Sequence, residues 1–401
     1  MIVSITKNRY IKILLITLLF ISCFGLIILD FRGLKYIYTF FLFYSCLKYK
    51  GKAPYKKAIL LYAFFVLCSC IYSAIYNHQF LIRLIGRTYE YWGILFVFII
   101  MSYKPSILQL EKVIKCLSII FCLCYLIQWI IYPINVFRGS LDELNIGNDV
   151  FRMRMSGSIC AYCLYFYGIN RYVQYHKNKN LIYSFLGFLP IIIMGFRSLT
   201  TLTLIFTFAM IPFITRKKSK TIMAYIFGII LISAISQLGI VQSKIDEMLD
   251  RQESGQTFDN KDYIRYIEYE YFTEVVFTKP MERLLGGGNP IDESTSYYQI
   301  MYDAADRLHF YWQDLGIVGL SFIIGIPAVI LLIWVVLRCI FQCKSPNLQY
   351  IRFTLLTVLL GSIFTSMELY RTANLLIISL YICLIYIDNS KNMQDISMYH
   401  K

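Results

Sequence analysis

Long apolar runs separated by short polar connections make up most of the chain. Twelve runs approach the roughly 20 residues that a helix needs to cross a bilayer. They are Ile11–Leu29, Leu34–Leu47, Ala58–Tyr76, Phe80–Met101, Val113–Val136, Ser156–Tyr175, Leu181–Phe196, Leu199–Ile214, Thr221–Val241, Leu315–Leu337, Ile351–Ser366 and Thr372–Ile387. The exception to the pattern is the long polar stretch Gln242–Arg307. We therefore predict an all-α, polytopic integral membrane protein with about 12 transmembrane helices.

Composition agrees with this prediction. The chain is 58% hydrophobic and 16% charged, whereas soluble domains have about 45–50% apolar and about 25% charged residues. We expect three parts: an N-terminal bundle of about nine helices (1–241), a large loop (242–309), and C-terminal helices with a short tail (310–401). The sequence leaves the number of spans between residues 30 and 100 open, because Leu34–Leu47 is short and Phe80–Met101 contains charged residues.

The distribution of cations predicts the topology. With the N-terminus in the cytoplasm, 23 of the 39 Lys and Arg residues lie on the cytoplasmic side, as the positive-inside rule requires. Both termini are then cytoplasmic, and the polar loop is extracytoplasmic and contains short helices. The net charge of +15 is explained by an anionic membrane surface rather than by nucleic acid.

The type of cation differs between the two sides. The predicted cytoplasmic side has 18 Lys and 5 Arg, and the outer side has 4 Lys and 12 Arg. Arginine binds phosphate oxygens with two parallel hydrogen bonds and stays charged in a partly dry site. An outer face rich in Arg suits a lipid-linked pyrophosphate. Alternatively, these arginines pair with acidic residues of the loop or extend to lipid headgroups.

Particular outer residues are candidates for that role. Arg152 and Arg154 precede the span that opens with Ser156, and Arg197 lies between two apolar runs with almost no loop to solvate it. An ionisable residue so close to the hydrocarbon is a functional candidate by default. We also expect Ser198 and Thr200 to cap the helix after Arg197, leaving its amides free for an anion. Alternatively, these arginines are anchors at helix ends.

The polar loop supplies further candidates. Asn260–Phe277 has helical spacing of apolar residues and carries Arg265 and Glu268. Gly286–Pro290 reads as a turn, and its glycines are weak evidence for phosphate binding. Near the end of the loop lie Arg307, His309 and Asp314. A histidine beside an arginine at a membrane edge suits a general base or a pyrophosphate contact, or simply an interfacial hydrogen bond.

A metal site is not expected. All twelve cysteines lie in or against apolar runs, and no His or Cys pair completes a zinc site. The outer loops contain no tight carboxylate cluster with the spacing of metal ligands. We therefore predict neither a metal nor a cofactor.

In their order along the chain, these features resemble the superfamily of O-antigen ligases and Wzy-type O-antigen or capsular polysaccharide polymerases. The similar features are an Arg-x-x-Gly that opens a span (Arg154 to Gly157), a Gly-x-Arg-Ser hairpin around Arg197, an Arg-led helix at Arg265, a Pro-x-x-x-Leu-Leu-Gly-x-Gly segment (Pro280 to Gly288), and a histidine before the next span, His309. They cover about half of the chain. Where the family often has His-Asn, this chain has His309-Phe310.

This resemblance implies glycosyl transfer at the outer face of the bacterial cytoplasmic membrane. The donor would be an undecaprenyl pyrophosphate-linked oligosaccharide, and the reaction would be metal-independent and inverting. The residues implied are Arg154, Arg197 and Arg265, with Arg152 and Arg307, for the pyrophosphate. His309 is the expected base, with Glu268 or Asp314 as rivals. Candidate partners are membrane lipids, a chain-length regulator and a flippase.

Three functions stay open. We favour a polymerase, whose acceptor is another lipid-linked repeat unit. A ligase would transfer the glycan to lipid A–core or to protein. A flippase or other transporter would more typically show internal repeats, short outer loops and charges deep within its spans.

Overall fold

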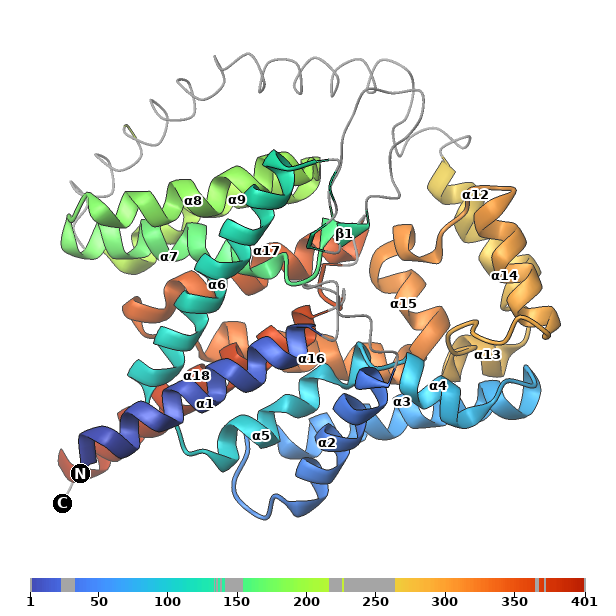
Figure 1. The fold of residues 1–401 in the computed structure, drawn as a ribbon, viewed down its shortest axis with the longest axis horizontal. Helices are drawn as coiled ribbons and strands as arrows, with labels where there is room; N and C mark the ends of the chain where they lie inside the picture. The colour runs from blue at the N-terminus through green and yellow to red at the C-terminus, as the bar shows by residue number, and fades with distance from the viewer. Residues whose placement is uncertain are drawn as a thin grey trace.

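Helices form nearly all of the regular structure in the computed structural model (Figure 1). It describes residues 2–22, 33–132, 134, 136–137, 139–140, 154–215, 226, 264–364, 368–370 and 373–399. Within these ranges the one β pairing joins β1 (Gly139–Ser140) to β2 (Arg154–Met155), two residues each and antiparallel. The predicted all-α class is confirmed.

The first half of the chain forms a series of apolar helices. They are α1 (Ile2–Ser22), α2 (Leu34–Lys48), α3 (Lys56–Tyr76), α4 (Leu81–Arg87), the 3₁₀ turn η1 (Tyr91–Leu95), α5 (Phe96–Ser102), α6 (Ile107–Ile130), α7 (Ile159–Tyr175), α8 (Lys179–Met194) and α9 (Arg197–Ile214). α6 starts with a reciprocal cap between Ser106 and Gln109, in which each side chain accepts the other residue's backbone N–H. Such a cap satisfies two of the helix's free amides and fixes its first turn.

The second half contains the short helices of the polar loop and then further apolar helices. They are α12 (Ile264–Tyr271), the π-helical turn η2 (Phe272–Val276), α13 (Pro280–Leu285), α14 (Ser296–Asp306), η3 (Trp312–Leu315), α15 (Gly316–Ile324), α16 (Ile326–Gln342), η4 (Pro346–Leu348), α17 (Gln349–Phe364) and α18 (Asn374–Tyr399). The predicted helix Asn260–Phe277 is confirmed from Ile264 onward, and residues 260–263 lie outside the described part.

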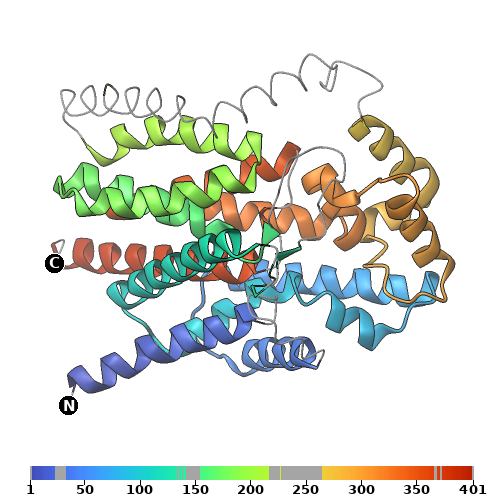
Figure 2. The same ribbon diagram turned by 45° about the horizontal axis from the view of Figure 1, so that its top comes forward.

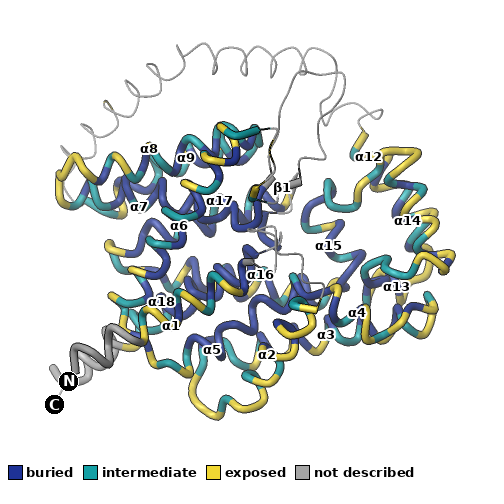
Figure 3. Tube along the Cα trace, viewed as in Figure 1, coloured by how far each residue is buried: buried dark blue, intermediate teal, exposed yellow. Residues whose placement is uncertain are grey.

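The core is built around α18. Residues 373–385 are buried at every position, as expected for a helix that is apolar on all sides. It packs against α5, η1, α6 and α16, and Figure 3 shows buried positions concentrated in these inner helices. α1 begins and α18 ends at one end of the molecule, whereas α12, α13 and α14 lie at the opposite end (Figures 1 and 2).

Fewer helices than predicted have full membrane-spanning character. Of the helices described, α3 and α6 alone combine the length and apolarity needed to cross a bilayer. α4 and α5 would be a third span if taken together, with a bend of 69° between them. Five further apolar stretches, in α8, α9, η3 with α15, α16 and the first part of α18, have only 10–17 residues, so the predicted number of about 12 spans is not established. The predicted span Thr221–Val241 lies outside the described residues.

One predicted span, Leu315–Leu337, is broken into α15 and α16 at Gly325. The glycine turn of the polar loop fills the break. The amides of Gly287 and Gly288 donate to the carbonyls of Phe322 and Ile323 at 2.8 and 3.0 Å. These amides are therefore used in packing, which supports the reading of this segment as a turn rather than a phosphate cradle.

Gly286 is held in this turn by two constraints. Its φ is +85°, which side chains disfavour, and a Cβ there would lie 2.4 Å from the carbonyl oxygen of Ile323. We expect Gly286→Ala to destabilise the docked loop by about 1–3 kcal/mol and to increase proteolysis within residues 264–309. The matched control is Gly33→Ala, because nothing lies within 4 Å of a Cβ at that position. Equal proteolysis of the two variants would contradict this account of the turn.

Candidate functional site

The site forms where α12 packs against η3 and the segment before it. Arg265, near the start of α12, donates a hydrogen bond from its guanidinium to the backbone carbonyl of Asp314. One turn further on, Oε1 of Glu268 accepts the backbone N–H of Tyr311 at 3.2 Å. These two contacts fix the helix to the segment that follows His309. The structure thus brings together three predicted site residues, Arg265, Glu268 and Asp314.

Glu268 has the properties of a proton acceptor that works near neutral pH. The residue is only 2% exposed, and Oε2 has no hydrogen-bond partner among the described residues. Burial raises the pKa of this carboxyl to about 7. The N–H of Tyr311 opposes the shift, Asp314 adds to it, and Arg265 opposes it. A carboxylate with one free oxygen and such a pKa can take a proton from a substrate hydroxyl.

This raised pKa predicts a dependence of stability on pH. The folded state holds the Glu268 proton more tightly than the unfolded chain, where the pKa is about 4.5. Stability from this group is therefore complete below about pH 4.5 and is lost as the pH rises to about 7. We expect wild type to lose about 3 kcal/mol relative to Glu268→Gln over that range, measured by thermal unfolding of the purified proteins. A difference that does not change with pH would contradict the shift.

His309 and Arg307 lie on the surface beside this site. His309 is exposed, with a φ of +55°, in the connection between α14 and η3. It lies two residues before Tyr311, whose amide binds Glu268. Nε of Arg307 lies 3.2 Å from Oδ1 of Asp303, and the Arg307 side chain is 75% exposed. Both residues can therefore be reached by a ligand that approaches from solvent.

For Arg154 and Arg197, the structure describes backbone positions only. Arg154 lies in β2, where it pairs with Ser140. Arg197 is the first residue of α9 and follows a left-handed Gly195 at the end of α8. Arg152 lies outside the described residues.

The predicted cap of α9 is wrong. The N-cap residue is Phe196, and no side chain caps it. The hydroxyl of Thr200 instead donates back to the carbonyl of Phe196 at 2.9 Å. A Thr hydroxyl one turn into a helix prefers this backbone acceptor, so it does not serve as a cap.

A second buried carboxylate was missed by the sequence analysis. Glu368, between α17 and α18, is 0% exposed and accepts the hydroxyl hydrogen of Ser158. Nδ2 of Asn374 donates to the same Ser158 oxygen at 3.2 Å. Ser158 directly follows Gly157, the end of the Arg-x-x-Gly motif. The available signal was a single acidic residue placed between two apolar runs, which is rare without a function.

η3 connects the two carboxylates. Glu268 binds the amide that precedes Trp312, and the Trp312 ring stacks on Tyr370 with centroids 6.2 Å apart. The hydroxyl of Tyr370, two residues after Glu368, donates to the carbonyl of Gly316 at 3.0 Å. Contacts therefore run from α12 through η3 to the connection that holds Ser158. These contacts link Ser158, four residues after Arg154, to the helix that carries Arg265.

In the described ranges, no three His, Cys, Asp or Glu side chains converge to hold a metal ion. Metal independence stays a prediction. In comparisons with known proteins, the chain matches no family model and no curated protein.

Proposed function

We propose that the protein is a polysaccharide polymerase that transfers glycan repeat units from an undecaprenyl pyrophosphate donor to a sugar hydroxyl of a lipid-linked acceptor. The observation that carries the proposal is Glu268, a buried carboxylate with a free oxygen and a pKa of about 7, one turn from Arg265. The order of motifs, which resembles that of O-antigen ligases and polymerases, supports it. The donor's pyrophosphate bond supplies the energy, so no cofactor is invoked.

The proposed reaction is a single displacement. Glu268 accepts the proton of the acceptor's hydroxyl group. At the same time, the oxygen of that hydroxyl group attacks the anomeric carbon of the donor sugar. The bond between that carbon and the pyrophosphate oxygen breaks, and its electron pair leaves with the phosphate. Arg154, Arg197 and Arg265 stabilise the charge that develops on the leaving group, as preorganised donors do in other transferases. The attack inverts the anomeric centre without a covalent intermediate.

The proposal assigns the base to Glu268 in place of His309, which the sequence analysis favoured, and Asp314 is the other rival. Asp314 is half-buried, and Arg265 binds its backbone carbonyl. His309 is exposed to solvent. Glu268 is preferred because it is the buried group of the three. In this proposal Arg152 and Arg307 make outer contacts to the pyrophosphate.

We place the protein in the bacterial cytoplasmic membrane as a multi-pass protein with both termini cytoplasmic. The location of α12, α13 and α14 at the end of the molecule opposite the start of α1 and the end of α18 supports this orientation (Figure 1). The lipid-linked donor then reaches the site within the outer leaflet. A chain-length regulator and a flippase are proposed partners.

A transporter is the second candidate, because the bend between α4 and α5 and the break at Gly325 are features of transporter helices. In those proteins the broken ends bind the cargo. Here the carbonyl of Ile323 accepts hydrogen bonds from Gly288 N and, at 2.6 Å, from the Ser69 hydroxyl. The break therefore anchors the polar loop, which favours the transferase.

The test is a gel of surface polysaccharide from a deletion strain that carries wild type or Arg197→Ala. Loss of the ladder in the variant with one repeat unit remaining supports a polymerase. Long lipid-linked chains that never reach a final acceptor would indicate a ligase. Repeat units that accumulate on the cytoplasmic face would indicate a flippase and overturn the proposal.

A further inference from the structure

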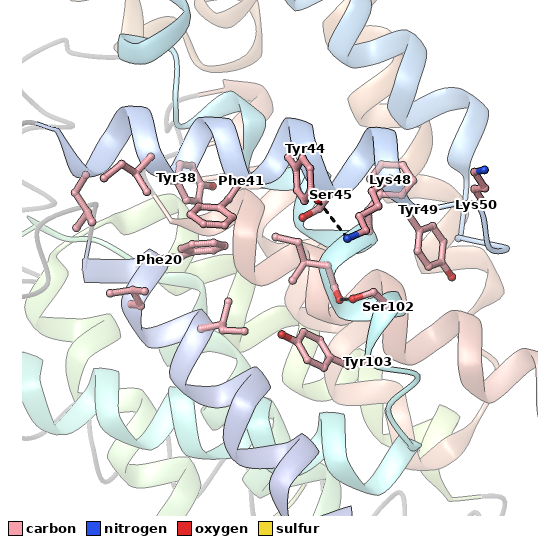
Figure 4. A pocket seen from close by; sticks show the side chains of 16 residues that line it. Phe20, Tyr38, Phe41, Tyr44, Ser45, Lys48, Tyr49, Lys50, Ser102 and Tyr103 are labelled. Atoms are coloured by element: carbon pink, nitrogen blue, oxygen red, sulfur yellow. Dashed lines mark hydrogen bonds between the residues drawn. The ribbon is translucent and has the colours of Figure 1, made fainter.

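A groove of about 650 Å³ lies between α1, α2 and α5 (Figure 4). Its volume falls within the range of about 300–1,000 Å³ that is typical of small-molecule sites. In Figure 4, Phe20, Tyr38 and Phe41 gather at one end, whereas Lys48, Ser102 and Tyr103 lie toward the other. The groove thus has an apolar end and a polar, cationic end.

The apolar part is left uncovered by the described chain. Leu19, Ile37 and Phe41 line it and are 54%, 52% and 48% exposed. They come from two helices that face each other across the groove, so the exposed carbon surface is continuous along it. Apolar surface on this scale favours a hydrocarbon ligand.

The polar end carries positive charge from lysines. Nζ of Lys48 donates to the hydroxyl of Tyr44 at 3.2 Å, and Lys50 lines the same end. The connection from Lys48 to Lys57 contains five lysines and no acidic residue. The hydroxyls of Ser102 and Tyr103 add polar groups on the α5 side. Such an end favours an anion that can also accept hydrogen bonds.

The length of the groove indicates how long the ligand's hydrocarbon chain is. Fourteen residue steps of α2 separate Leu34 from Lys48, which is about 21 Å at 1.5 Å per residue. One leaflet of hydrocarbon is about 15 Å thick. The groove therefore accommodates one acyl chain of a single leaflet, with room for a headgroup, whereas the much longer chain of a polyprenyl phosphate would extend beyond it.

We infer that this groove binds an anionic glycerophospholipid, with one acyl chain along α2 and its phosphate at Lys48 and Lys50. This inference rests on the proposed membrane location and not on the proposed sugar transfer. In the proposed orientation the lipid belongs to the cytoplasmic leaflet, on the side opposite the polar loop. The groove is separate from Glu268 and the residues around it.

The test uses full-length protein in phosphatidylcholine nanodiscs. Each sample contains a small fraction of phosphatidylglycerol or phosphatidylcholine with a photoactivatable acyl chain, and labelled peptides are mapped by mass spectrometry. We expect phosphatidylglycerol to label the α1, α2 and α5 peptides at least fivefold more than phosphatidylcholine, since one lysine near an anionic surface contributes about fivefold. Lys48→Gln/Lys50→Gln should reduce labelling to the phosphatidylcholine level.

The matched control is Lys52→Gln/Lys57→Gln, which removes the same charge from the same connection at residues that do not line the groove. It should keep the preference for phosphatidylglycerol. Ile37→Trp, which narrows the groove and keeps both lysines, should reduce labelling by the anionic probe. Thermal unfolding of each variant checks that the bundle is intact.

Three results would overturn the inference. Equal labelling by the two probes would indicate ordinary boundary lipid. An equal loss in the two double variants would indicate a general attraction to the anionic surface. Stronger competition by a polyprenyl phosphate than by unlabelled phosphatidylglycerol would assign the groove to an isoprenoid carrier. Sugar transfer is not a readout, so failure here leaves the proposed function untouched.

Discussion

Glu268→Gln should reduce sugar transfer by about 10²–10⁴-fold, the usual contribution of a general base. The amide has nearly the same shape as the carboxyl and can keep the contact with Tyr311 N–H, but it cannot accept a proton from the acceptor hydroxyl. The amount of protein in the membrane should not fall, because a buried ionised carboxylate destabilises the fold and the neutral amide does not. The measurement is the rate of chain extension from a purified lipid-linked repeat unit.

The same role predicts the pH profile. Transfer requires ionised Glu268, so the wild-type rate should rise with pH and level off above a midpoint near 7, where burial places the pKa. Glu270→Gln is the matched control, because this carboxylate is exposed on the same helix. It should keep both the rate and the midpoint. If Glu268→Gln retains a wild-type rate, Glu268 is not the base, and His309→Gln becomes the decisive variant.

Arg265→Ala should reduce transfer by about 10²–10³-fold, as the loss of one preorganised donor to a developing charge does elsewhere. The guanidinium gives one hydrogen bond to the Asp314 carbonyl, and it is close enough to Glu268 to oppose the rise in the pKa of that carboxyl. Arg265→Lys should rescue poorly, because an ammonium keeps the charge but lacks the planar fork. Rates should be normalised to folded protein and measured at saturating donor.

Arg283 provides the structural comparison. Its guanidinium also binds backbone carbonyls, those of Phe277 and Thr273 at 2.9 and 2.7 Å, and it lies on the same loop. Arg283→Ala should lower stability more than turnover per folded molecule. If Arg265→Ala shows that same pattern, or if Arg265→Lys restores full activity, the role of Arg265 in binding pyrophosphate fails.

Much of the helical architecture could be predicted from the pattern of apolar residues. The run Leu34–Leu47 matches α2 within one residue, and Ala58–Tyr76 matches α3 within two. The helix that carries Arg265 and Glu268 was recognised from its spacing. Such helices can be recognised from their own sequence. When one face of a helix is buried, apolar residues recur along that segment with the helical period.

What the sequence did not predict depends on contacts between distant residues. The turn that packs at the break beside Gly325 lies almost forty positions earlier in the chain. No local sequence signal links the two segments. The contact of Arg265 with the Asp314 carbonyl likewise joins residues 49 positions apart. Glu368 was overlooked because its neighbour, Ser158, lies 210 positions away. Its position between two apolar runs marks it as unusual in the sequence, but its hydrogen-bond partner is known only from the fold.

The most direct test of the central claim is transfer by the purified protein alone in proteoliposomes, with one lipid pyrophosphate-linked repeat unit as both donor and acceptor. The mixture contains a metal chelator and no nucleotide. We predict that glycan chains lengthen, that lipid pyrophosphate is released at each step, and that Glu268→Gln supports neither. Absence of lengthening by well-folded wild type given its cognate repeat unit, or lengthening that requires a divalent metal, would contradict the account.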